Sequence, residues 1–126
     1  MLKRVLLVSL LIISFESMAG GVVSELKTLE RQAEDIRKVA ITCYVELKVF
    51  KKSAWGNDSC IEYREFDKPM MQKFKANLEE QSVEFKRYSK DPDASRKRIL
   101  RGLRYLVSTK EYLQSVKNIR KSINSL

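Results

Sequence analysis

Apolar and small residues recur at alternating spacings of three and four along residues 26–50, without a break. The positions are Leu26, Leu29, Ala33, Ile36, Ala40, Cys43, Leu47 and Phe50. This spacing puts one continuous stripe along a helix, and it is the heptad pattern by which helices pack side by side. Small residues such as Ala33 and Ala40 let a neighbouring helix approach closely. The pattern predicts a helix from Ser24 to Phe50, with Ser24 as its N-cap.

Two later segments repeat the spacing. Asp67-Lys68-Pro69 predicts the start of a second helix, because proline fits the first helical turn. Its apolar positions are Met71, Phe74, Leu78, Phe85 and Tyr88, with Gln81 as a polar interruption. Asp91-Pro92-Asp93 then predicts a third helix over 92–124, with Asp91 as N-cap. Its stripe uses Ile99, Leu103, Leu106 and Leu113, and then Val116, Ile119, Ile123 and Leu126. The short connection predicts that the second and third helices are antiparallel neighbours.

The N-terminus has the pattern of an export signal. Lys3 and Arg4 precede an apolar run of eleven residues, Val5 to Phe15, and Ser17-Met18-Ala19 supplies the small residues of a cleavage site. A membrane span needs about 20 apolar residues, so a retained anchor is less favoured. The cleavage site has no cysteine, so a lipid-anchored lipoprotein is not expected. We expect a signal peptide over 1–19, a single mature domain over 20–126, no membrane span in the mature chain, and a periplasmic or secreted location.

Cys43 and Cys60 are the only two cysteines. An even count in an oxidising compartment predicts one intrachain disulfide, worth about 3 kcal/mol in the chain-entropy model. A bridge between chains and two buried thiols are the alternatives. The bond requires the chain after Trp55 to return along the first helix, partly extended or as a short turn. The predicted fold is all-α: a small antiparallel three-helix bundle, with this return segment as a possible fourth element.

The composition gives little support to an enzyme. The chain has no histidine, the commonest general base and neutral metal ligand, and both cysteines are expected to be oxidised. We find no Gly-rich phosphate loop, no metal-ligand cluster and no carboxylate pair beyond those expected on helix surfaces. The sequence therefore predicts a protein that is not an enzyme and has no cofactor and no metal site.

The positive charge is concentrated near the C-terminus. Residues 20–95 are electrically neutral, whereas residues 96–126 contain nine Lys or Arg and one acidic residue, Glu111. On a helical wheel, Lys97, Arg101 and Arg104 stand opposite the apolar stripe, and Arg98 flanks them. This basic stripe is either a solvated face that keeps the protein soluble or a surface that binds an acidic partner.

Two single residues also call for an explanation. Gly102 lies inside the basic helix at a cost of about 1 kcal/mol relative to Ala, which is either a tolerated defect or a sign of close packing with a partner. Trp55, the only tryptophan, lies in a turn beside Lys51 and Lys52. It either covers one end of the bundle or anchors an interface.

These features favour a small exported binding protein. Its expected partner is a protein with an acidic surface, which it would occlude as an inhibitor or immunity protein does; the partner-binding candidates are Lys97, Arg98, Arg101, Arg104 and Trp55. The layout loosely resembles small exported helical proteins of bacterial envelopes, among them periplasmic immunity proteins and periplasmic parts of secretion machines. The alternatives are a structural or adaptor component of an envelope assembly, whose heptad seams would serve to form a homo-oligomer, and an electrostatic binder of anionic lipid or polysaccharide. Specific nucleic-acid binding is not expected, because no nucleic-acid-binding motif is present.

Overall fold

The computed structural model describes residues 21–66 and 69–126, and all their regular structure is helical. The elements are α2 (Val22–Phe50), the short 3-10 helix η2 (Lys51–Gly56), α3 (Asp58–Glu65), α4 (Pro69–Ser89) and α5 (Arg96–Asn124). The all-α prediction is confirmed. The expected signal peptide, with its cleavage site after Ala19, lies outside the described residues.

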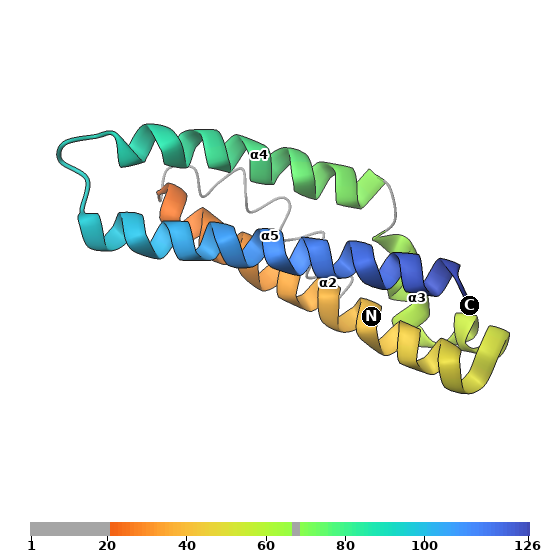
Figure 1. Cartoon of the computed structure of the whole chain (residues 1–126). Coiled ribbons are helices and arrows are strands. Elements are labelled where there is room, and N and C mark those ends of the chain that lie inside the picture. The colour runs from red at the N-terminus through yellow and green to blue at the C-terminus, as the bar shows by residue number, and fades with distance from the viewer. Residues whose placement is uncertain (1–20, 67–68) are drawn as a thin grey trace.

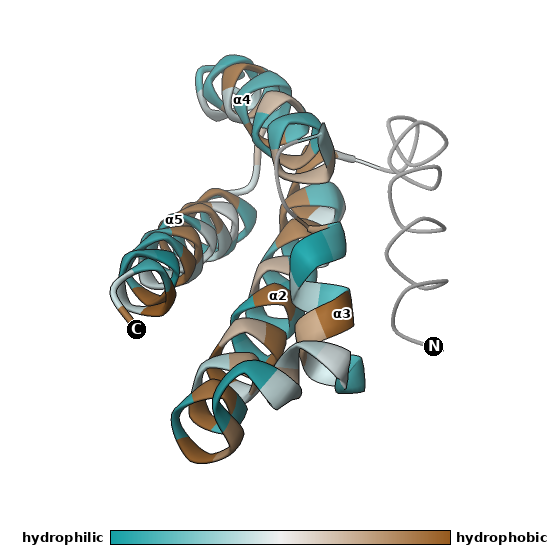
Figure 2. Ribbon diagram, turned by 90° about the vertical axis from the view of Figure 1, so that its right-hand side faces the viewer, coloured by the Kyte–Doolittle hydropathy of each residue, from teal (hydrophilic) through white to brown (hydrophobic). Residues whose placement is uncertain are grey.

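The three long helices lie side by side (Figure 1). Helix α4 runs antiparallel to α5, as the short connection predicts, and α2 and α5 run parallel to each other. The end-on view shows α2 between α5 and α3, with α4 above (Figure 2). Helix α5 packs chiefly along α2, however, and contacts α4 much less.

Helix α2 forms the centre of the core. Its predicted seam from Leu26 to Leu47 is buried, and Val23 and Val39 add to it. The seam ends one step earlier than expected, because Phe50 is 57% exposed. The helix also begins earlier: Val22 is its first residue and Gly21 its N-cap, so the Ser24 cap is wrong.

The predicted disulfide joins Cys43 of α2 to Cys60 of α3, with 4.7 Å between their Cα atoms. Both cysteines are completely buried. The return segment is helical rather than extended: η2 turns the chain at the end of α2, and α3 packs back against α2. The possible fourth element of the bundle is therefore present, as η2 and α3.

The boundaries of the later helices were predicted unequally well. Pro69 begins α4, and α5 ends at Asn124, as expected. However, α5 begins at Arg96, and its N-cap is Ser95, whose hydroxyl accepts a hydrogen bond from the Arg98 amide. The expected N-cap, Asp91, instead accepts a hydrogen bond from the Asp93 amide at 2.9 Å. This local turn competes with helix formation and delays the start of α5.

Among the described helices, none combines the length and the apolar character that crossing a bilayer requires.

Candidate binding surface on helix α5

The four basic candidates on α5 are all exposed, but they do not form one cluster. The buried residues of α5 are Gly102, Thr109, Val116 and Ile123. At 100° per residue, Lys97 and Arg104 lie on the side of α5 away from Gly102 and Thr109, whereas Arg101 lies on the flank between the two sides. The Arg98 guanidinium instead lies beside Gly21, at the start of α2. No described salt bridge involves any of the four.

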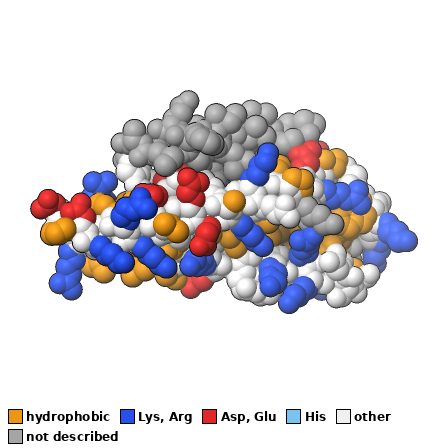
Figure 3. Space-filling view, turned by 90° about the horizontal axis from the view of Figure 1, so that it is seen from above, with side chains coloured by type: hydrophobic (Ala, Val, Ile, Leu, Met, Phe, Trp, Pro, Cys, Tyr) orange, Lys and Arg blue, Asp and Glu red, His pale blue; other side chains and the backbone are white. Residues whose placement is uncertain are grey.

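The structure corrects the apolar stripe of α5. Leu103, expected in the core, is 47% exposed, and Leu100 and Val107 are 55% and 48% exposed. The spacing of three and four between these residues places them in one row on the outer face, which we call the outer stripe. Arg104 and Lys97 lie to one side of the outer stripe and Lys110 to the other. Figure 3 shows the molecule from above, with α5 along its lower edge. Basic side chains lie along this edge, with hydrophobic side chains between some of them.

Gly102 explains why the outer stripe faces solvent. The ring of Phe85 on α4 lies directly against Gly102, and a Cβ at this position would overlap the ring edge. Close approach of the ring turns the Gly102 side of α5 inward. The opposite side, with the outer stripe, therefore turns outward. The close packing considered for Gly102 is real, but the neighbour is a side chain of the same protein.

Sequence reasoning missed the outer stripe because it assigned Leu103 to the core and gave Leu100 and Val107 no role. A signal was present in the small and medium residues: Gly102, Thr109, Val116 and Ile123 recur every seven positions. A strict repeat of seven residues marks the buried side of packed helices. This repeat, rather than the leucines, identifies the inward face of α5.

Trp55 lies at the other end of the bundle from the basic stripe. It belongs to η2 and borders a pocket with Ile123 at the end of α5. The rise of an α-helix puts Ile123 about 33 Å along the axis from Arg101. The Trp55 ring is half-buried, and the Arg64 guanidinium stacks on it at 4.2 Å from the ring centroid. Trp55 and the basic stripe are therefore separate candidate sites.

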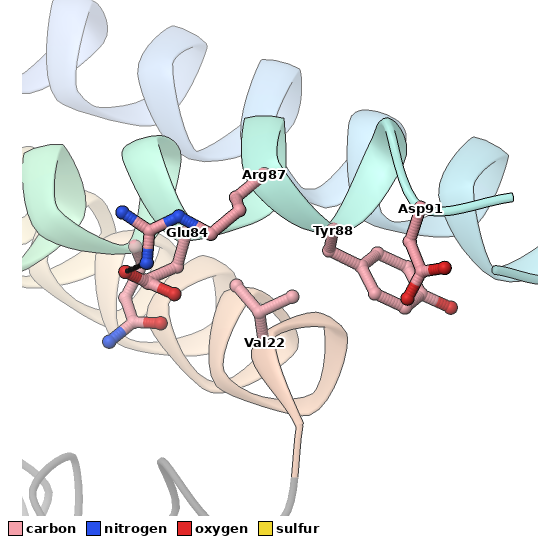
Figure 4. A pocket seen from close by; sticks show the side chains of 6 residues that line it. Val22, Glu84, Arg87, Tyr88 and Asp91 are labelled. Atoms are coloured by element: carbon pink, nitrogen blue, oxygen red, sulfur yellow. Dashed lines mark hydrogen bonds and ion pairs between the residues drawn. The ribbon is translucent and has the colours of Figure 1, made fainter. Parts of the chain in front are cut away.

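A further pocket, of about 320 Å³, lies between α4 and the start of α2 (Figure 4). Its labelled side chains come from α4, from Val22 and, in the case of Asp91, from the connection after α4. An ion pair of 2.9 Å joins Arg87 to Glu84, one helical turn apart. Tyr88 and Asp91 lie next to each other at the other side. The lining carries both charges, with no group of side chains that favours one class of ligand, so we assign it no chemistry.

Within 21–66 and 69–126, no three Cys, Asp or Glu side chains are grouped so that they could hold a metal ion. The chain matches no protein-family model, and neither a curated protein nor a solved structure is found to match it.

Proposed function

We propose that this protein is an exported, non-enzymatic binding protein that occludes an acidic partner protein through the outer face of α5. The observation that supports this best is the outer stripe, Leu100, Leu103 and Val107, exposed on a helix whose neighbouring residues are basic. The export-signal pattern over residues 1–19 and the buried disulfide support an exported location.

The arrangement fits a helix that enters a groove. In that mode of recognition, apolar side chains at positions i, i+3 and i+7 fill a hydrophobic groove, and charged residues beside them select the partner. Leu100, Leu103 and Val107 have this spacing. Lys97, Arg101 and Arg104 would meet carboxylates on the rim of the groove, and Arg would form bidentate contacts with them.

Charge argues against a second copy of this chain as the occupant. Two α5 helices packed along their outer stripes would bring the basic residues of each chain against those of the other. Like charges facing each other across an interface cost several kcal/mol. A partner with carboxylates around an apolar groove satisfies both features of the surface.

The test uses the mature domain, 20–126, with a photo-crosslinking phenylalanine analogue in place of Leu103. The control places the same analogue at Val83 on α4, which is 48% exposed and so matches Leu103. In an extract of exported proteins, position 103 is expected to crosslink to an acidic protein that position 83 does not reach. Equal crosslinking from both positions would contradict the proposal.

Charge reversal then tests the basic residues. Arg101→Glu with Arg104→Glu should abolish the crosslink and leave helicity unchanged, whereas the matched pair Lys73→Glu with Lys75→Glu on α4 should retain it. Wild-type association should slow as salt rises, because screening shortens to about 8 Å at physiological ionic strength. Binding to anionic phospholipid vesicles, with no protein crosslink, would assign the face to a lipid surface instead and overturn the proposal.

A further inference from the structure

A second pocket lies at the end of the bundle where α2 and α5 both finish. It has a volume of about 370 Å³, and the residues around it are Leu47, Lys51, Lys52, Trp55, Ile123 and Leu126. Leu47 and Ile123 are buried core residues, and Lys51 and Lys52 are exposed. The pocket thus combines apolar walls with two positive charges, and it has no acidic side chain among the residues that line it.

The walls of this pocket are held firmly. Leu47 and Ile123 belong to the same buried cluster as the disulfide cysteines and Ala54, and Trp55 packs against that cluster. The disulfide fixes α3 to α2 directly beneath η2. Arg64, on α3, stacks on Trp55 and adds a further positive charge beside the ring. A pocket with fixed walls pays a smaller entropic cost when it binds a ligand.

The backbone at Lys51 is strained. Its φ is 57° and its ψ is −143°, and it is the only residue other than glycine with a positive φ in the described chain. A side chain with a Cβ rarely adopts this conformation, and such residues are found at ligand clamps as well as at tight turns. Glycine would fit here at lower cost. A lysine at this position therefore puts a charge at the rim of the pocket at a cost in backbone energy.

We propose that this end pocket binds a small anionic amphiphile, with its apolar chain against Leu47, Trp55 and Ile123 and its carboxylate or phosphate head beside Lys51 and Lys52. A small anion alone would gain little, because contacts with exposed lysines are weak in water. An uncharged apolar ligand would gain no attraction from the two lysines, which are exposed to water. The volume is at the low end of the usual range for ligand pockets, about 300–1,000 Å³, which favours a single short chain over a two-tailed lipid.

The experiment uses Trp55 as its own reporter, because the mature domain contains no other tryptophan. The oxidised domain is titrated with decanoate below its micelle concentration, and the emission of Trp55 is recorded. The other arms are decyl phosphate, decanol, decyltrimethylammonium, inorganic phosphate and acetate. Saturable changes are expected with decanoate or decyl phosphate, and the stronger of the two identifies the preferred head group. Decanol should bind at least about tenfold more weakly, and the cationic amphiphile and the head groups alone should not bind.

Substitution of the lysines makes the test specific. Lys51→Gln with Lys52→Gln should weaken the anionic amphiphiles by about tenfold and leave decanol unchanged. Lys73 and Lys75 on α4 are also exposed. Lys73→Gln with Lys75→Gln should change neither the affinity for the anionic amphiphiles nor that for decanol. Circular dichroism in each arm separates binding from detergent-like unfolding, which lowers helicity.

The proposal is overturned by any of four results: equal binding of decanoate and decanol, equal effects of anionic and cationic amphiphiles, equal loss in the two lysine pairs, or loss of helicity at the concentrations that change the emission. A short acidic peptide that carries leucine and binds where decanoate does not would assign the pocket to a protein partner instead. None of these results bears on the outer stripe of α5, which is at the other end of the bundle.

Discussion

Helices α2 and α5 are equal in length, 29 residues each, yet they contribute very differently to the protein. Helix α2 buries eleven residues and packs against every other described element, whereas α5 buries only four. The buried side of α2 includes large apolar residues such as Leu26, Leu29 and Ile36 among smaller and polar ones, whereas the four buried residues of α5 include a glycine and a threonine. Much of the apolar area of α5 is thus left for solvent or for a partner. Similar amphipathic patterns therefore serve two purposes here: that of α2 stabilises the core, and that of α5 leaves an apolar surface exposed.

The sharpest test exchanges the same residue type on the two helices. Leu29→Ala on α2 removes a completely buried side chain and should lower the free energy of unfolding by about 2–5 kcal/mol. Leu103→Ala on α5 removes an exposed one and should change it by no more than about 0.5 kcal/mol. Urea denaturation of the oxidised domain measures both. Similar losses would mean that Leu103 is part of the core after all.

Removal of the disulfide should have the next largest effect. Cys43→Ala with Cys60→Ala opens the covalent loop at one end of α2 and should cost about 3 kcal/mol. The loss of amide protection in hydrogen exchange should be greatest in η2 and α3 and smaller where α4 meets α5. Uniform loss along all helices would show that the bond stabilises the whole bundle rather than its end.

The contact that orients α5 can be tested by adding one methyl group. Gly102→Ala places a Cβ against the Phe85 ring and should destabilise the fold by about 1–3 kcal/mol, although Ala favours a helix. Phe85→Leu in the same chain should reduce this penalty. Gly56→Ala is the control, because a Cβ there meets no atom within 4 Å. Thermal unfolding of the variants separates the cases; a stabilising Gly102→Ala would mean that the ring moves aside freely.

The smallest expected effect concerns how the two helices end. The C-cap of α5 is Ser125, with an ordinary φ of −91°, whereas the C-cap of α2 is Lys51, with its positive φ. Lys51→Gly should therefore raise the free energy of unfolding by about 0.5–1 kcal/mol, since the strain is relieved. Lys52→Gly, at a position without a positive φ, should lower it by a similar amount. Guanidinium denaturation can distinguish the increase in the free energy of unfolding from the decrease.

The parts of this fold that follow from local pattern could be predicted. The seam of α2 needs only regular spacing, Pro69 marks the start of α4 by its own geometry, and the cysteine pair needs only an even count in an oxidising compartment. The predictions failed where two local interactions competed for one residue, or where a choice depended on a contact between distant residues. Asp91 is a good N-cap by type, but its carboxylate is engaged by Asp93. The rotation of α5 depends on Phe85 and Gly102, which nothing in the local sequence connects.

The candidate sites also divide into features set by the local sequence and features set by contacts between distant residues. Exposure of the basic residues on α5 could be read from charge and spacing, but the outer stripe could not, because it depends on that rotation. The end pocket was also missed: it joins residues from α2, η2 and α5, and only Trp55 among them was singled out. Whether either surface binds a partner stays a prediction.

The pairing of α2 with α5 has a consequence for the order in which the protein takes shape. These helices form the largest contact of the bundle, yet η2, α3 and α4 lie between them in the chain. At about 5–20 residues per second, a ribosome completes α2 some seconds before α5 exists. During that interval only η2, α3 and α4 can cover the hydrophobic side of α2, and each contacts α2 much less than α5 does. Closing so long a loop also slows the pairing of α2 with α5. We therefore expect a chaperone to bind the nascent chain at α2 until α5 has been synthesised.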